Sequence, residues 1–176
     1  MWARRASRRV VSLITGIKAP GATSARFPPV CNNRAVPNFS ADQQLPPPKP
    51  GRPRIAVLPF VATPYQLHLA QRLTRELPEA EFVFLYTDES PDQSWKLAMP
   101  EEVNAVRFAT GCPAAGEARP ADQLKFWRRG GILSDWMRKN RASALICYGH
   151  NDLGRLRLVR WCGRNKVPYF LAADSN

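Results

Sequence analysis

The fold class is decided by one stretch near the end of the chain, residues 144–172, which reads ALICYGHNDLGRLRLVRWCGRNKVPYFLA. An apolar run is followed by a polar turn, a helical pattern and a second apolar run. Apolar runs of this length, bounded by turn residues, indicate buried strands. A strand, a helix and a second strand in this order are typical of a parallel β-sheet.

The same alternation extends upstream. Strands are predicted at residues 54–61, 81–87, 103–108, 142–149 and 167–172, and helices at 63–77, at 121–141 and within 148–162. Most of the strands are apolar on both faces, which indicates a sheet covered by helices on both sides. The predicted fold is therefore α/β, a doubly wound, Rossmann-like parallel sheet of about five strands. We expect the second and third strands on one side of the first strand, and the fourth and fifth on the other.

Helical spacing also predicts which residues face the core. The second helix carries an inner stripe of four residues, Phe126, Gly130, Leu133 and Met137. The third helix places Leu158, Val159 and Cys162 on its inner side. Its opposite side carries Arg157, Arg160 and Arg164, which we interpret as a solvated face.

The positive charge is concentrated at the start of the chain. The formal net charge is +12, but the first 53 residues hold nine Lys or Arg against one acid, whereas residues 54–176 hold seventeen against thirteen. The basic composition is therefore weak evidence that the folded part binds nucleic acid.

Residues 1–53 are predicted to be a disordered basic leader and a Pro-rich linker, ahead of a domain at residues 54–176. Three interpretations of the leader stay open: a transit-type targeting peptide, a basic amphipathic segment that touches anionic lipid, or translated sequence upstream of the true start. The third is favoured, because the basic and apolar residues of the leader each cover only about one helical turn.

Composition excludes several classes of protein. No apolar run approaches the roughly 20 residues of a membrane-spanning helix. The four cysteines form no CxxC pair and have no paired histidines near them, so neither a zinc site nor a disulfide framework is expected. The turn after the first strand, VATPYQ, has no glycine, which disfavours dinucleotide or triphosphate binding. We therefore expect no metal, no cofactor and no specific nucleic-acid partner, in a reducing, cytoplasmic compartment.

The candidate site lies at the rim of the sheet where the strands end and the winding reverses, because doubly wound folds bind ligands there. The first helix begins at this rim, with Thr63 as N-cap, Pro64 in its first turn and Gln66 as the other half of a capping box. Tyr65 and His68 lie in the first two turns of the same helix.

The third helix begins at the same rim with a polar cluster, His150, Asn151 and Asp152. Asn151 and Asp152 are good N-caps, and the backbone N–H groups of this turn could receive an anionic or hydroxyl-rich ligand. Arg155 falls on the inner side of the first turn, where the helix dipole disfavours a cation. Two interpretations of Arg155 stay open: a ligand contact, or an ion pair with Asp152 or Asp174.

Two stretches of the chain resemble family 4 glycosyltransferases. LPFVATPYQLHLAQRLTRELPE, residues 58–79, is similar to the first strand and helix of the N-terminal half of their GT-B fold. ALICYGHNDLGRLRLVRWCGRNKVPYFLAADSN, residues 144–176, resembles a later strand, helix and strand, which end in an Asp/Glu-Ser-Asn turn. The similarity covers about residues 54–176.

The resemblance implies the N-terminal, acceptor-side domain of a glycosyltransferase, truncated before the second domain that holds a nucleotide-sugar donor. Its partner would be a sugar, glycolipid or polysaccharide acceptor, with peripheral membrane contact. The residues at the expected acceptor side are Thr63, Tyr65, His68, His150, Asn151, Asp152, Arg155 and Asp174. Family members that bind donor phosphate through a glycine-rich first loop have glycines where this chain has Ala62, Thr63 and Pro64, and no catalytic residue carries over.

Sugar transfer by this chain alone is not expected, because transfer requires donor and acceptor in one geometry. A second class of function stays open, a small Rossmann-like binding or interaction module, with nucleic-acid binding through the basic leader as a weaker form of it. Marginal stability is also expected, because no helix follows the fifth strand to cover it.

Overall fold

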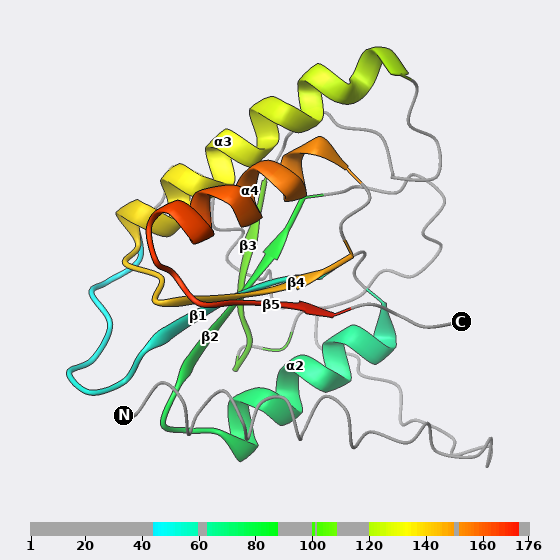
Figure 1. Ribbon diagram of the computed structural model, residues 1–176. Helices are drawn as coiled ribbons and strands as arrows, with labels where there is room; N and C mark the ends of the chain where they lie inside the picture. Colours follow the sequence, from blue (N-terminus) through cyan, green and yellow to red (C-terminus); the bar gives the residue numbers. More distant parts are fainter. Residues whose placement is uncertain are drawn as a thin grey trace. The chain divides into compact units, whose positions relative to one another are not determined.

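Strand β1 (Arg54–Leu58) is buried along its whole length and lies at the centre of a five-stranded sheet (Figure 1). The other strands are β2 (Glu81–Tyr86), β3 (Asn104–Arg107), β4 (Ala144–Tyr148) and β5 (Tyr169–Ala172). All neighbouring strands pair in parallel, in the order β3-β2-β1-β4-β5. The predicted doubly wound sheet is confirmed, including the side of β1 on which each strand lies.

The computed structural model describes residues 44–59, 63–87, 100, 102–108, 120–149 and 152–172. All of them lie in the second of two compact units into which the chain divides, Arg34–Asn176. Among the helices in these ranges, none combines the length and the apolar character that crossing a membrane requires.

Helices cover both faces of the sheet. Helix α2 (Pro64–Glu76) lies on one face, whereas α3 (Gln123–Lys139) and α4 (Leu153–Arg164) lie side by side on the other (Figure 1). A short 3-10 helix, η1 (Pro120–Asp122), leads into α3. This two-sided cover explains why the three central strands are apolar on both faces.

One cluster of buried apolar residues lies between the sheet and the α3–α4 layer. The predicted inner stripe of α3 is confirmed, because Phe126, Gly130, Leu133 and Met137 are all buried. From α4, Leu158 and Cys162 are buried in the same cluster, whereas Val159 is only half-buried. The apolar residues of the central strands that face this layer complete the cluster.

The two edge strands are less buried than the three central strands. β3 is exposed at both of its ends. On β5, Tyr169 and Leu171 are 46% and 41% exposed. Edge strands receive less cover because they have a neighbour on one side only, so a uniform apolar pattern is not required of them.

Helices α3 and α4 approach each other closely at two glycines. A Cβ atom added to Gly130 would lie 2.4 Å from the carbonyl oxygen of Gly154, and one added to Gly154 would lie 2.4 Å from the carbonyl oxygen of Phe126. These contacts are shorter than any side-chain carbon tolerates. The glycine pair that interrupts the helical pattern of α3 is therefore explained for Gly130 by backbone-to-backbone packing.

The end of the Pro-rich segment ahead of the sheet contacts the folded domain. Residues 44–53 are described, and the backbone N–H of Leu45 donates to the Asn140 side-chain oxygen at 2.8 Å. The carbonyl of Pro46 accepts a hydrogen bond from Arg54 at 2.6 Å. Contacts with the folded domain supply the order that the composition of the segment alone would not.

Two cysteines of the core are buried free thiols, Cys147 on β4 and Cys162 on α4. Burial raises the pKa of the Cys147 thiol to about 11 and that of the Cys162 thiol to about 12. Because the thiolate is the reactive form, we expect both residues to resist alkylation in the native protein at pH 8 and to react once it is unfolded. Mass spectrometry of the two peptides after brief alkylation measures this.

The same shifts predict how stability depends on pH. A thiol whose pKa is raised by folding contributes stability that is fully present below its unfolded pKa, near 8.5, and is lost as the pH rises through the folded value. The free energy of unfolding should therefore fall as the pH rises from about 9 towards 11. The double variant Cys147→Ala/Cys162→Ala should lose less stability over this interval than the parent protein. An identical pH dependence in both proteins would contradict the assignment.

Candidate functional site

The rim where β1 and β4 end is the point at which the winding of the sheet reverses. Helix α2 follows β1 and leads to β2, whereas α4 follows β4 and leads to β5 on the other side. Both helices therefore begin at this rim, with their free backbone N–H groups at the same edge of the sheet.

Thr63 starts α2 as predicted. Its side-chain oxygen accepts a hydrogen bond from the backbone N–H of Gln66 at 3.2 Å, and Pro64 follows in the first turn. The prediction that Gln66 forms the second half of a capping box is wrong. The Gln66 side chain turns into the protein, and its Oε1 atom is buried with no hydrogen-bond partner among the residues that the structure describes. A Gln on the inner stripe of a helix cannot also reach back to the solvent side of the N-cap.

Tyr65 and His68 lie on the outer surface of the first two turns of α2. Tyr65 is 54% exposed, and His68 is also exposed. Residues three apart on a helix share one side, so both rings can reach a ligand at the rim. The other predicted residues of the rim, His150, Asn151 and Asp174, lie outside the described residues.

Asp152 starts α4 as its N-cap and is buried. Its Oδ1 atom accepts a hydrogen bond from the backbone N–H of Arg155 at 2.9 Å. Its Oδ2 atom lies 3.1 Å from Nε of Arg155 and 2.8 Å from Nη2 of Arg129. The side chain of Asp152 is 4% exposed, and those of Arg155 and Arg129 are each 2% exposed. The three charges therefore form an ion-pair cluster inside the protein. The interpretation of Arg155 as an ion-pair partner of Asp152 is confirmed.

Arg155 also joins the two strands that meet at the reversal point. Its Nη1 group donates to the carbonyl oxygen of Tyr148, at the end of β4, and its Nη2 group donates to the carbonyl oxygen of Pro59, just beyond β1, at 3.1 Å. Buried backbone carbonyls need such donors. Arg155 and Asp152 therefore determine the shape of the rim from inside, while Tyr65 and His68 are exposed polar side chains near it.

Arg129 was not identified from the sequence. It is buried on α3, and its guanidinium also lies over the Phe126 ring at 4.7 Å. A sequence signal exists: Arg129 stands three residues after Phe126 and four before Leu133, on the apolar side of the helix. A cation in that position needs a buried carboxylate.

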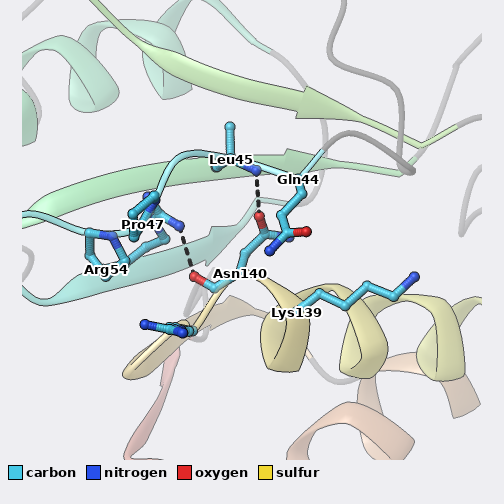
Figure 2. Close-up of a pocket in the computed structure, with 8 residues that line it drawn as sticks. Gln44, Leu45, Pro47, Arg54, Lys139 and Asn140 are labelled. Carbon is cyan, nitrogen blue, oxygen red and sulfur yellow. Dashed lines mark hydrogen bonds between the residues drawn. The ribbon is translucent and has the colours of Figure 1, made fainter.

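The described cavity lies at the opposite edge of the sheet, where the strands begin. It has a volume of about 180 Å³ and is lined by the Pro-rich segment, by Arg54 and by the end of α3 (Figure 2). Figure 2 shows Lys139 pointing along this end of α3, and Asn140 between the two walls. The predicted site residues of the rim are not among those that line the cavity.

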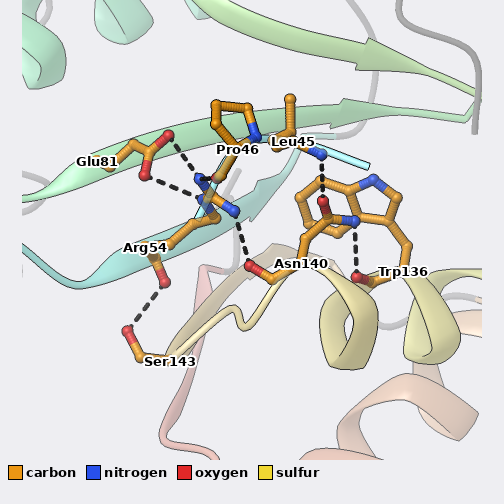
Figure 3. A network of polar contacts seen from close by, with 7 residues as sticks. All are labelled: Leu45, Pro46, Arg54, Glu81, Trp136, Asn140 and Ser143. Carbon is orange, nitrogen blue, oxygen red and sulfur yellow. Dashed lines mark hydrogen bonds and ion pairs between the residues drawn. The ribbon is translucent and has the colours of Figure 1, made fainter. Parts of the chain in front are cut away.

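A polar network closes the wall of that cavity (Figure 3). Arg54 is 1% exposed and binds both carboxylate oxygens of Glu81, at 3.0 and 3.1 Å. The same guanidinium donates to the carbonyl of Asn140 at 2.8 Å and to that of Pro46. These four hydrogen bonds of Arg54 are made to protein groups, which gives its guanidinium a structural role.

Within the described residues, no three His, Cys, Asp or Glu side chains come together as a metal site. The chemistry that the described rim offers is hydrogen bonding and ring contact from Tyr65 and His68, beside two helix starts.

Seventeen chains of solved structures match this chain. Neither a protein-family model nor a curated protein matches the chain. A solved structure titled "Crystal structure of LpCGTa in complex with UDP" matches 71% of this chain at 16% sequence identity, with a TM-score of 0.47. The chain covers 31% of the length of that structure.

Proposed function

We propose that residues 54–176 form the acceptor-binding domain of a GT-B glycosyltransferase of family 4 type, which transfers sugar from a nucleotide-sugar donor held by a second domain. The observation that supports this most is the order of the sheet. The two stretches that resemble the family supply the last residue of β1 with α2, and β4–α4–β5, at the reversal point. A sugar acceptor would then lie over the rim, against Tyr65 and His68.

The rim suits a neutral, hydroxyl-rich ligand. Tyr65 offers a hydroxyl and an aromatic face, and His68 offers a ring nitrogen as donor or acceptor. The role proposed for Asp152 and Arg155 is positioning, because their described hydrogen bonds are made to protein groups. His150, Asn151 and Asp174 remain proposed acceptor contacts. The protein would work in the cytoplasm, in peripheral contact with a membrane.

Binding of a simple sugar tests the proposal. Titration of the ¹⁵N-labelled chain with N-acetylglucosamine and with glucose is expected to shift the backbone amide resonances of Tyr65 and His68, with smaller changes at Lys139, at the far edge of the sheet. No sugar transfer is expected when a nucleotide sugar is added to the chain alone, because both substrates must be held in one geometry. Transfer by the chain alone would contradict the assignment to an acceptor domain.

The variant His68→Ala is expected to weaken binding of the sugar that shifts the rim by roughly three- to tenfold, the value of one hydrogen bond. Its stability should not change, because the side chain is exposed. The matched control is Arg75→Ala, a substitution at the far end of the same helix. Equal affinities in the two variants, or no sugar-induced shift at the rim, would favour an interaction module over a sugar-binding domain.

A further inference from the structure

Five large apolar side chains are exposed on helices α3 and α4, among them Ile132 of α3, which is 44% exposed. Leu124 and Trp127 of α3 are 58% and 42% exposed, and Leu153 and Leu156 of α4 are 40% and 47% exposed. Single exposed apolar residues are common on protein surfaces, whereas several on one pair of neighbouring helices indicate a contact site.

Arginines lie among these apolar residues. Arg157, Arg160 and Arg164 are three and four residues apart on α4, so they form one stripe, and Arg128 is exposed on α3. The sequence of α4 contains no acid, and that of α3 contains only Asp135, which pairs with Arg138 at 2.9 Å. In the part of the chain that the structure describes, no carboxylate forms an ion pair with any of the four arginines.

The stripes on the two helices are joined into one surface. The guanidinium of Arg157 lies 4.9 Å from the centroid of the Trp127 ring and donates to the Trp127 carbonyl at 2.8 Å. The backbones of the helices touch at Gly130 and Gly154, one turn from this contact. The apolar side chains and the arginines therefore form a continuous patch, which we call the outer surface of α3–α4.

On the opposite face of the domain, the arginines of α2 are paired with acidic side chains. On α2, Arg72 pairs with Glu76 at 2.7 Å, and Arg75 pairs with Glu102 at 2.9 Å. Of the helices that cover the two faces of the sheet, α3 and α4 therefore carry the cations that have no carboxylate partner among the described residues.

We propose that the outer surface of α3–α4 binds an anionic lipid membrane. The arginines pair with lipid phosphates, and Leu153, Leu156 and Trp127 enter the boundary between headgroups and acyl chains. The exposed leucines favour a lipid partner over a nucleic acid, because the phosphate backbone of a nucleic acid offers leucine side chains no apolar environment. The proposal names the surface for the peripheral membrane contact proposed above. It does not require sugar binding, so failure of one leaves the other intact.

Sedimentation with vesicles tests the role of charge. The whole chain is expected to bind vesicles of phosphatidylcholine and phosphatidylglycerol in equal amounts, and to bind pure phosphatidylcholine much more weakly. The double variant Arg160→Glu/Arg164→Glu should bind the anionic vesicles at least about tenfold more weakly. The control is Arg72→Glu/Arg75→Glu on α2, which changes the net charge by the same amount and leaves the basic leader intact. If both variants lose affinity equally, or if the parent chain does not bind, the proposal is wrong.

The apolar part of the surface needs a separate variant. Leu153→Ser/Leu156→Ser is expected to weaken vesicle binding by about tenfold as well, because two exposed leucines no longer enter the lipid. Its affinity for duplex DNA should equal that of the parent chain. Unchanged vesicle binding by this variant, together with DNA binding that falls in Arg160→Glu/Arg164→Glu, would assign the surface to nucleic acid and overturn the proposal.

Discussion

Replacing Gly130 with alanine is expected to lower the free energy of unfolding by roughly 1–3 kcal/mol or more, the cost of overpacking a core. The new methyl group would lie 2.4 Å from the carbonyl oxygen of Gly154 and 2.9 Å from its Cα atom. Both are backbone atoms of α4, so relief requires the two helices to move apart. Because the crossing also places Arg129 beside Asp152, the movement would strain the buried ion pair. Urea unfolding, followed by far-UV circular dichroism, measures the loss.

Two other glycines provide matched controls for this variant. Gly163 has no atom within 4 Å of an added Cβ, so Gly163→Ala should raise stability by up to about 1 kcal/mol through better helix propensity. At Gly131 the three atoms nearest to an added Cβ belong to the guanidinium of Arg157, each at 3.0 Å, and that flexible group can move away. We expect stability to fall in the order Gly163→Ala, Gly131→Ala, Gly130→Ala. A Gly130→Ala protein as stable as the parent would show that the helices do not cross this closely.

Replacing Asp152 with alanine is expected to cost about 3–5 kcal/mol, the usual effect of removing one partner from a buried ion pair. Asp152 is the described carboxylate between Arg129 and Arg155, and all three side chains are buried. The substitution also removes the N-cap of α4, which alone is worth roughly 1 kcal/mol. Denaturant unfolding gives the total.

Asp152→Asn separates the two effects. Asparagine is a good N-cap but carries no charge, so this variant should keep the capping contribution and lose the ion pair. The control is Asp135→Ala on α3, whose partner Arg138 is exposed, and it should change stability by less than about 0.5 kcal/mol. If Asp152→Ala is no more destabilising than Asp135→Ala, the buried ion pair is not what holds the start of α4.

The fold was predictable because its signals are local. Most strands of the sheet are largely apolar runs, and each helix has an apolar stripe within a few residues. The two helix starts at the rim were also predictable, because each N-cap, Thr63 or Asp152, binds a backbone group three residues away. The capping box failed at Gln66, because the demand for an inward-facing side chain overrode the local motif.

The polar contacts between distant segments could not be read from the sequence in the same way. Arg54 and Glu81 are 27 residues apart, and they meet because they occupy the same register position of β1 and β2. Once the parallel pairing is known, opposite charges at the first position of both strands become a readable signal. The hydrogen bonds of Arg155 to the ends of β1 and β4 depend on the order of the strands in the sheet. Arg155 can be recognised as a donor from the sequence, whereas the carbonyls that accept from it cannot.

The contact between the Pro-rich segment and the end of α3 affects how the protein can be shortened. Composition places the domain boundary at residue 53, and a fragment cut there would keep every strand of the sheet. It would also remove Pro46, whose carbonyl accepts a hydrogen bond from Arg54, and Leu45, whose backbone N–H donates to the Asn140 side chain. A fragment for crystallisation or spectroscopy should therefore begin no later than Gln44, so that these two polar side chains keep the partners that the full chain gives them.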